Sequence, residues 1–109
     1  MTPAPNTRIR VTDKAQRGEV IQIRAIIQHP MENGYNFDTQ GSTIPVHIID
    51  TFTCSYNGTE IFRVKLEPGM AANPYLSFYT VATESGTIEF VWHDDDGSIY
   101  RAARQIEVT

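Results

Sequence analysis

Residues 73–93 decide the fold of this chain, and they read NPYLSFYTVATESGTIEFVWH. Two runs rich in β-branched and aromatic residues, Tyr75–Thr83 and Thr87–His93, flank the short polar break Glu84-Ser85-Gly86. Runs of this kind on either side of a short break that contains glycine are typical of a β-hairpin. We therefore predict a central hairpin whose turn is the polar break.

The two strands of this predicted hairpin differ in their faces. The second run places its large apolar side chains on one face, as in a strand with one buried side: Ile88, Phe90 and Trp92. The first run is apolar on both faces, with Leu76, Phe78 and Ala82 on one and Tyr75, Tyr79 and Val81 on the other. A strand of that kind needs cover on each side. We expect one face to lie in the core and the other to lie partly against a further sheet, a loop or a partner chain.

The rest of the chain shows the same two-residue period. Alternation of apolar and polar residues indicates further strands near residues 8–12, 19–28, 48–56, 60–67 and 98–109. Asn57-Gly58 predicts a tight type I′ turn, because both central residues of that turn need positive φ. No segment has a helical period. About seven short strands with turn signals between them predict an all-β protein, an immunoglobulin-like antiparallel β-sandwich.

Length and composition restrict the class of protein. With 109 residues the chain can bury the core of one domain without metals or disulfides. We expect residues 7–109 to form that domain and residues 1–6 to form a flexible tail. The formal net charge is −4 and charges of both signs are interspersed, which does not favour nucleic acid as a partner. No apolar run approaches the roughly 20 residues of a membrane span.

The first residues also lack the apolar core of a secretory signal. Taken alone, this feature would indicate a cytosolic protein, or one that is exported by means that it does not itself encode.

The surplus of apolar and aromatic residues predicts a surface for a protein partner. The segment from Met31 to His47 is a long polar loop that carries a few large apolar side chains, and loops of that length in small domains are usually functional or covered. Aromatic residues and methionine are enriched at protein interfaces. The candidate interface residues are Met31, Tyr35, Phe37, Tyr75, Tyr79 and Val81. If the isolated chain leaves such a surface uncovered, we expect that it can form homo-oligomers.

The single cysteine does not have the setting of a reactive thiol. Cys54 lies in a predicted strand between Phe52 and Tyr56, on the apolar face, and it has no second cysteine with which to form a disulfide. A reactive thiolate needs a nearby cation or a helix N-terminus and some exposure. We therefore predict that Cys54 is a buried structural thiol.

A metal centre is the alternative that the histidines suggest. Cys54, the three methionines and the three histidines, His29, His47 and His93, invite comparison with a small metal-binding electron-transfer or reductase β-sandwich. The close downstream spacing of cysteine, histidine and methionine that is usual in copper sandwiches is absent. We predict no metal ligand, cofactor or catalytic residue, and elemental analysis with a visible spectrum separates the two interpretations. The acidic run 94–97 (DDDG) is interpreted as a solvated hairpin turn rather than a calcium loop.

Several separated blocks of the sequence resemble one known family. They are residues 17–21 (RGEVI), 27–34 (IQHPMENG), 52–58 (FTCSYNG), 71–78 (AANPYLSF) and 82–90 (ATESGTIEF). In these blocks the chain closely resembles the SoxZ family, the small subunits of the SoxYZ carrier of bacterial thiosulfate oxidation. The resemblance covers roughly residues 8–108.

The resemblance implies an immunoglobulin-like sandwich that pairs with a SoxY chain. In such complexes the sulfur intermediates are bound covalently to a cysteine in the flexible, glycine-rich C-terminus of SoxY, and other Sox enzymes act on them. The SoxZ chain does not carry the reactive thiol, and residues 105–109 here read QIEVT, without cysteine. The complex is periplasmic, and SoxZ is thought to be exported together with its partner. The resemblance thus implies a non-catalytic subunit, in the periplasm, without a signal peptide of its own.

Overall fold

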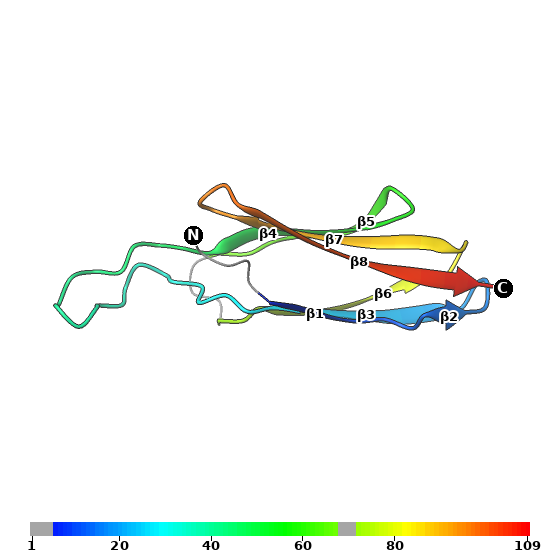
Figure 1. Cartoon of the computed structure of the whole chain (residues 1–109), viewed down its shortest axis with the longest axis horizontal. Helices are drawn as coiled ribbons and strands as arrows, with labels where there is room; N and C mark the ends of the chain where they lie inside the picture. Colours follow the sequence, from blue (N-terminus) through cyan, green and yellow to red (C-terminus); the bar gives the residue numbers. More distant parts are fainter. Residues whose placement is uncertain (1–5, 68–71) are drawn as a thin grey trace.

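The computed structural model describes residues 6–67 and 72–109, which form two facing β-sheets (Figure 1). One sheet has three strands in the order β1 (Thr7–Arg10), β3 (Val20–Ile27) and β6 (Tyr75–Val81). The other has five, in the order β2 (Lys14–Ala15), β8 (Ile99–Val108), β7 (Gly86–Asp94), β4 (Ile49–Tyr56) and β5 (Thr59–Lys65). Neighbouring strands are antiparallel except β2 and β8, which are parallel.

This architecture confirms the predicted all-β sandwich, with eight strands where about seven were expected. The additional strand is β2, whose two residues are too short to show a period. Within the described residues, no helix is long and apolar enough to cross a membrane. The tail predicted for residues 1–6 lies outside the described residues, apart from Asn6.

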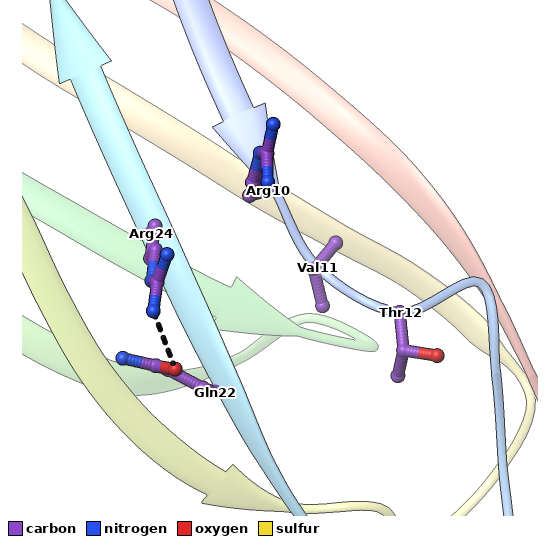
Figure 2. A pocket seen from close by; sticks show the side chains of 5 residues that line it. All are labelled: Arg10, Val11, Thr12, Gln22 and Arg24. Atoms are coloured by element: carbon purple, nitrogen blue, oxygen red, sulfur yellow. Dashed lines mark hydrogen bonds between the residues drawn. The ribbon is translucent and has the colours of Figure 1, made fainter.

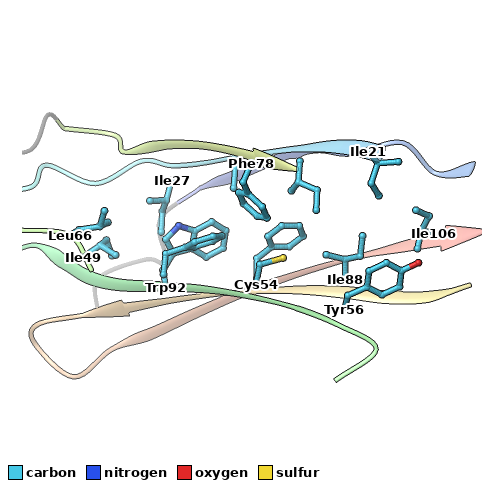
Figure 3. Close-up of a cluster of buried hydrophobic side chains, with 14 of the residues drawn as sticks. Ile21, Ile27, Ile49, Cys54, Tyr56, Leu66, Phe78, Ile88, Trp92 and Ile106 are labelled. Atoms are coloured by element: carbon cyan, nitrogen blue, oxygen red, sulfur yellow. The ribbon is translucent and has the colours of Figure 1, made fainter. Parts of the chain in front are cut away.

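The core lies between the two sheets and is built from the inward faces of the alternating strands (Figure 3). Phe52 of β4 is fully buried, and its ring centroid lies 5.2 Å from that of Trp92 and 6.1 Å from that of Phe78. Phe62 of β5 stacks on Phe78 of β6 with centroids 4.2 Å apart, which joins the two sheets along one side. Ring pairs at these separations add packing energy beyond their buried area.

The predicted central hairpin is wrong. β6 pairs with β3 in the smaller sheet, whereas β7 pairs with β4 and β8 in the larger one, so the chain crosses between the sheets at residues 82–85. The hydroxyl of Tyr56 donates to the carbonyl of Glu84 and accepts from the backbone N–H groups of Thr83 and Glu84. The crossing is therefore hydrogen-bonded to β4, which lies in the larger sheet.

The Asn57-Gly58 turn also contacts the crossing. Both residues have positive φ, 49° and 82°, as predicted for a type I′ turn between β4 and β5. The side chain of Asn57 accepts from the N–H of Thr87 at 2.9 Å and donates to the carbonyl of Ser85 at 3.3 Å. This close approach requires glycine at position 86, where a Cβ would lie 1.7 Å from the Asn57 Oδ1.

The long loop is an ordered arm that projects beyond one end of the sandwich, drawn cyan to green in Figure 1. At its base, Glu32 and His47 exchange two backbone hydrogen bonds of 2.8 and 2.9 Å. Near its tip, Phe37 and Thr43 form a second antiparallel bridge, and Asp38 accepts the N–H groups of Gln40 and Ser42. Paired backbone groups therefore shape this segment, although it contains no named strand.

Candidate partner interface

The smaller sheet turns one face to the core and the other away from it, and we call the second the outer face. Strands β1, β3 and β6 alternate between these faces, and the inward side of β3 consists of Ile21, Ile23, Ala25 and Ile27. The outer face is formed by Arg8, Arg10, Val20, Gln22, Arg24, Ile26, Tyr75, Ser77, Tyr79 and Val81. No element of the described chain covers it.

Three predicted interface residues lie together on this outer face. Tyr75, Tyr79 and Val81 are exposed by 57%, 66% and 45%. Val81 lies directly opposite Val20 of β3, which is 63% exposed, and Tyr75 lies opposite Ile26. These two apolar pairs lie at opposite ends of the outer face, with the pairs Gln22–Tyr79 and Arg24–Ser77 between them. Exposed aromatic side chains such as Tyr75 and Tyr79 are enriched at protein-binding sites.

An arginine cluster lies on the same outer face, and the sequence analysis did not identify it. Arg10 of β1 and Arg24 of β3 are directly opposite each other, and Arg8 is one outer-face position away on β1. Arg24 donates to the Gln22 Oε1 at 3.2 Å, and Figure 2 shows Arg10 and Arg24 along one shallow hollow. Within the described residues, none of the three guanidinium groups forms an ion pair.

Like charges placed directly opposite on a sheet are unfavourable, so the pair Arg10–Arg24 lowers the stability of the sheet slightly unless an anionic group lies nearby. The whole chain has a net charge of −4, which makes a local excess of three cations on one face distinctive. The outer face is therefore complementary to a surface that carries carboxylates.

The arm places two further predicted residues on the surface. Tyr35 and Phe37 are 82% and 68% exposed. Met31 differs from the prediction, because only 4% of it is exposed and its Sδ accepts the N–H of Ile49 at 3.3 Å. Its positive φ of 50° turns the chain at the base of the arm so that the side chain enters the core instead of the surface.

Cys54 has the environment of a structural thiol. It is fully buried between the sheets, and this burial raises the pKa of Cys54 to about 12. At pH 7 such a thiol stays protonated, whereas the thiolate is the nucleophilic form. The side chain also has no path to a substrate, because the inward faces of both sheets enclose it (Figure 3).

A second group of polar side chains is buried at the base of the arm. The carboxylate of Asp94 is fully buried and accepts from the Nε2 of His29 at 2.9 Å and from the Nε2 of His47 at 3.0 Å. It also accepts from the Tyr100 hydroxyl at 3.2 Å and from the N–H of Asp96 at 3.2 Å. The predicted solvated hairpin turn is thus present at residues 95–97, between β7 and β8, but Asp94 is buried and is not part of its solvated surface.

The pKa of Asp94 reflects this environment. Burial alone would raise the pKa, but the hydrogen bonds from Asp96 and His29 and the charge of His47 outweigh burial and hold the pKa below its ordinary value. The carboxylate form of Asp94 is therefore the form that the fold stabilises.

Two of the three histidines come together, but they are poorly arranged for a metal. His29, His47 and Asp94 offer ligand atoms within 4.8 Å of one another, whereas His93 lies on the opposite face of β7 and does not join them. The N–H of Met31 donates to the Nδ1 of His29 at 3.0 Å, so the ring hydrogen must be on Nε2, which faces Asp94. In a histidine that binds a metal, the ring nitrogen that does not bind the metal usually carries the hydrogen and donates a hydrogen bond. In His29 the nitrogen away from Asp94 accepts a hydrogen bond instead. His29 therefore does not fit a metal ligand through Nε2.

One family model matches most of the chain. It is described as sulphur oxidation protein SoxZ and it matches residues 9–105. No curated protein matches the sequence at a significant level.

Solved structures with a similar fold include two kinds of protein. Superoxide reductase (neelaredoxin) from Ignicoccus hospitalis is 20% identical with a TM-score of 0.76, over 96% of this chain and 82% of that one. The sulfur carrier protein SoxY from Chlorobium limicola f thiosulfatophilum is 15% identical with a TM-score of 0.66, over 94% of this chain and 78% of that one. At these identities the likeness shows a shared fold alone.

Proposed function

Because the chain belongs to the SoxZ family, we propose that it is the non-catalytic partner subunit of a SoxYZ-type sulfur carrier complex in sulfur oxidation. It pairs with a SoxY-type chain, which holds the sulfur intermediate on its own cysteine, and it works with that chain in the periplasm after joint export. Its role is to bind the partner and to shape the surface on which other Sox enzymes act.

The uncovered outer face is the observation that carries this proposal. It combines exposed aromatic side chains, Tyr75 and Tyr79, with three arginines, and tyrosine and arginine are the residue types that most often dominate binding energy. The buried Cys54 supports the proposal that this chain does not carry the sulfur intermediate, because a thiol with a pKa of about 12 is a poor sulfur acceptor. In such a complex the reactive thiol belongs to the other chain.

The decisive experiment introduces one carboxylate into each candidate surface. We expect Tyr79→Asp to weaken pairing with the SoxY-type partner by about 100-fold, because a buried unpaired charge costs several kcal/mol. Co-expression pull-down and calorimetric titration measure the loss. Ala103→Asp, at an exposed position on the larger sheet, is the matched control and should leave pairing unchanged.

Tyr35→Asp applies the same change to the arm. If Tyr35→Asp abolishes pairing while folded Tyr79→Asp binds normally, the interface is on the arm instead of the outer face. If neither folded variant changes the affinity, both surfaces are excluded.

A further inference from the structure

One edge of the sandwich differs in composition from all the others. Sheet edges in natural proteins are usually protected by charged residues, which disfavour pairing with another strand. The strands at three of the edges carry such residues: Arg8 and Arg10 in β1, Lys14 in β2, and Glu60, Arg63 and Lys65 in β5. The part of β8 that β2 leaves uncovered carries Arg101 and Arg104. β6 reads YLSFYTV and has no charged residue over its seven positions.

The register shows which backbone groups of β6 have no partner within residues 6–67 and 72–109. The N–H of Ile27 donates to the carbonyl of Pro74, and the N–H of Ala82 donates to the carbonyl of Glu19. In an antiparallel pair, hydrogen-bonded residues alternate with residues whose N–H and C=O point the other way. Leu76, Phe78 and Thr80 therefore bond to β3. The residues between them, Tyr75, Ser77, Tyr79 and Val81, direct their backbone groups to the open edge.

The same four residues carry their side chains on the outer face. Tyr75, Ser77, Tyr79 and Val81 thus present side chains to one surface and, to the edge beside it, backbone groups that no other described residue pairs. An added strand would continue the sheet and its outer face together. This is the arrangement by which an extended segment binds to an exposed sheet edge.

We propose that β6 is completed by an extended strand of the partner chain, which pairs with the backbone of Tyr75–Val81 and places a carboxylate on the outer face beside Ser77. This inference rests on the proposed function and specifies how that partner binds. The position of the carboxylate follows from the residues that lie side by side on neighbouring strands. Arg10, Arg24 and Ser77 lie side by side on the outer face, so the next residue across the sheet would lie beside Ser77, about 10 Å and two strands from Arg24. The long side chain of Arg24 can reach a carboxylate there by leaving its hydrogen bond to Gln22.

Charge selects this occupant over a second copy of the chain. Pairing of β6 with another β6 would join two outer faces that each carry three arginines, and it would supply no carboxylate to either. A partner strand with an acidic residue offsets the repulsion between Arg10 and Arg24.

The first test removes one outward backbone donor. Ser77→Pro deletes an N–H that points to the open edge, a position at which sheets tolerate proline. Ser77→Ala is the matched control, since it loses the hydroxyl that accepts from Gln22 but keeps the N–H. We expect Ser77→Pro to weaken partner binding at least tenfold and Ser77→Ala to change it less than about threefold. Circular dichroism and thermal melting of both variants establish that they are folded.

The second test uses the unmodified protein and hydrogen exchange of its backbone amides. In the isolated chain the amides of Ser77 and Tyr79 should exchange fast and those of Phe78 and Thr80 slowly, because only the latter pair with β3. Addition of the partner should slow the exchange of the Ser77 and Tyr79 amides, so that fast and slow amides no longer alternate along β6.

Each contrary result has a distinct meaning. If the unmodified chain binds the partner but Ser77 and Tyr79 still exchange fast, the edge inference is wrong and the proposed function stands. If a second copy occupies the edge and the partner does not displace it, the inference is also wrong. If the unmodified chain does not bind the partner at all, the proposed function fails and the inference fails with it.

Discussion

A single carboxylate holds three parts of the chain together at one end of the sandwich. Asp94 ends β7, and it accepts hydrogen bonds from His29 after β3, from His47 at the base of the arm and from Tyr100 in β8. Each hydrogen bond to a charged group contributes about 1.5–3 kcal/mol to stability. Removing one partner costs more when the charged group is buried than when it is exposed to solvent. Asp94 is therefore expected to fix the position of the arm relative to the sandwich.

Asp94 makes stability depend on pH in a predictable direction. The pKa of Asp94 is lowered in the folded chain, so its contribution is complete above the unfolded value of about 4 and is lost as pH falls through the lower, folded value. We expect Asp94→Asn to lower the free energy of unfolding by about 3 kcal/mol at pH 7. Below about pH 4 the difference from the unmodified chain should shrink.

Urea unfolding at several pH values measures this difference. Asp95→Asn, at the exposed neighbouring position, is the control and should change stability by less than about 0.5 kcal/mol. A loss for Asp94→Asn that stayed constant from pH 7 to pH 3 would contradict the assignment of the lowered pKa to Asp94.

At the scale of elements, the crossing between the sheets depends on one close approach. Gly86→Ala would place a Cβ against the side chain of Asn57, which bonds both Ser85 and Thr87. We expect a loss of about 2 kcal/mol, the usual cost of overpacking, together with a lower thermal midpoint.

A double-mutant cycle identifies the cause of that loss. Asn57→Gly keeps a residue that accepts positive φ but removes the side chain that a Cβ at position 86 would meet. In the Asn57→Gly background, Gly86→Ala should therefore cost at least 1 kcal/mol less than in the unmodified chain. Equal costs in both backgrounds would show that the strain arises elsewhere.

Alternation was sufficient to locate the main strands, but it does not specify their partners. Each strand of a sandwich shows the same two-residue period whether its neighbour lies in the same sheet or across the core. The break Glu84-Ser85-Gly86 has the composition of a hairpin turn, and only its contacts with Tyr56 and Asn57 distinguish it as a crossing. The Asn57-Gly58 turn was predictable because its two residues determine its geometry locally.

The polar sites were harder to predict for the same reason. His29, His47 and Asp94 are separated by 18 and 47 positions, and nothing in their spacing indicates that they meet. Met31 looked like a surface residue because its segment is polar, but a positive φ turns it into the core. The exposure of Tyr75, Tyr79 and Val81 was predictable, because local alternation assigns them to the face opposite Phe78.

At the scale of the whole molecule, charge is distributed unevenly. The chain carries a net charge of −4, yet its outer face presents Arg8, Arg10 and Arg24 without an ion pair among the described residues. Attraction between this face and an acidic partner should speed association at low salt. Self-association of the isolated chain through β6 would instead bring like charges together, so salt should favour it.

These two processes are therefore expected to respond to salt in opposite directions. Between about 50 and 500 mM NaCl, the association rate constant with the partner should fall about tenfold, because the Debye length shortens well below the span of the arginine cluster. Over the same range, light scattering at several protein concentrations should show more self-association as the salt concentration rises.

Arg24→Glu should slow association with the partner at low salt and make the association rate constant depend less on salt. Arg101→Glu makes the same change of charge on the larger sheet, and it should alter neither the association rate constant nor its salt dependence. If both variants slowed association equally, net charge would be responsible and the outer face would have no special role.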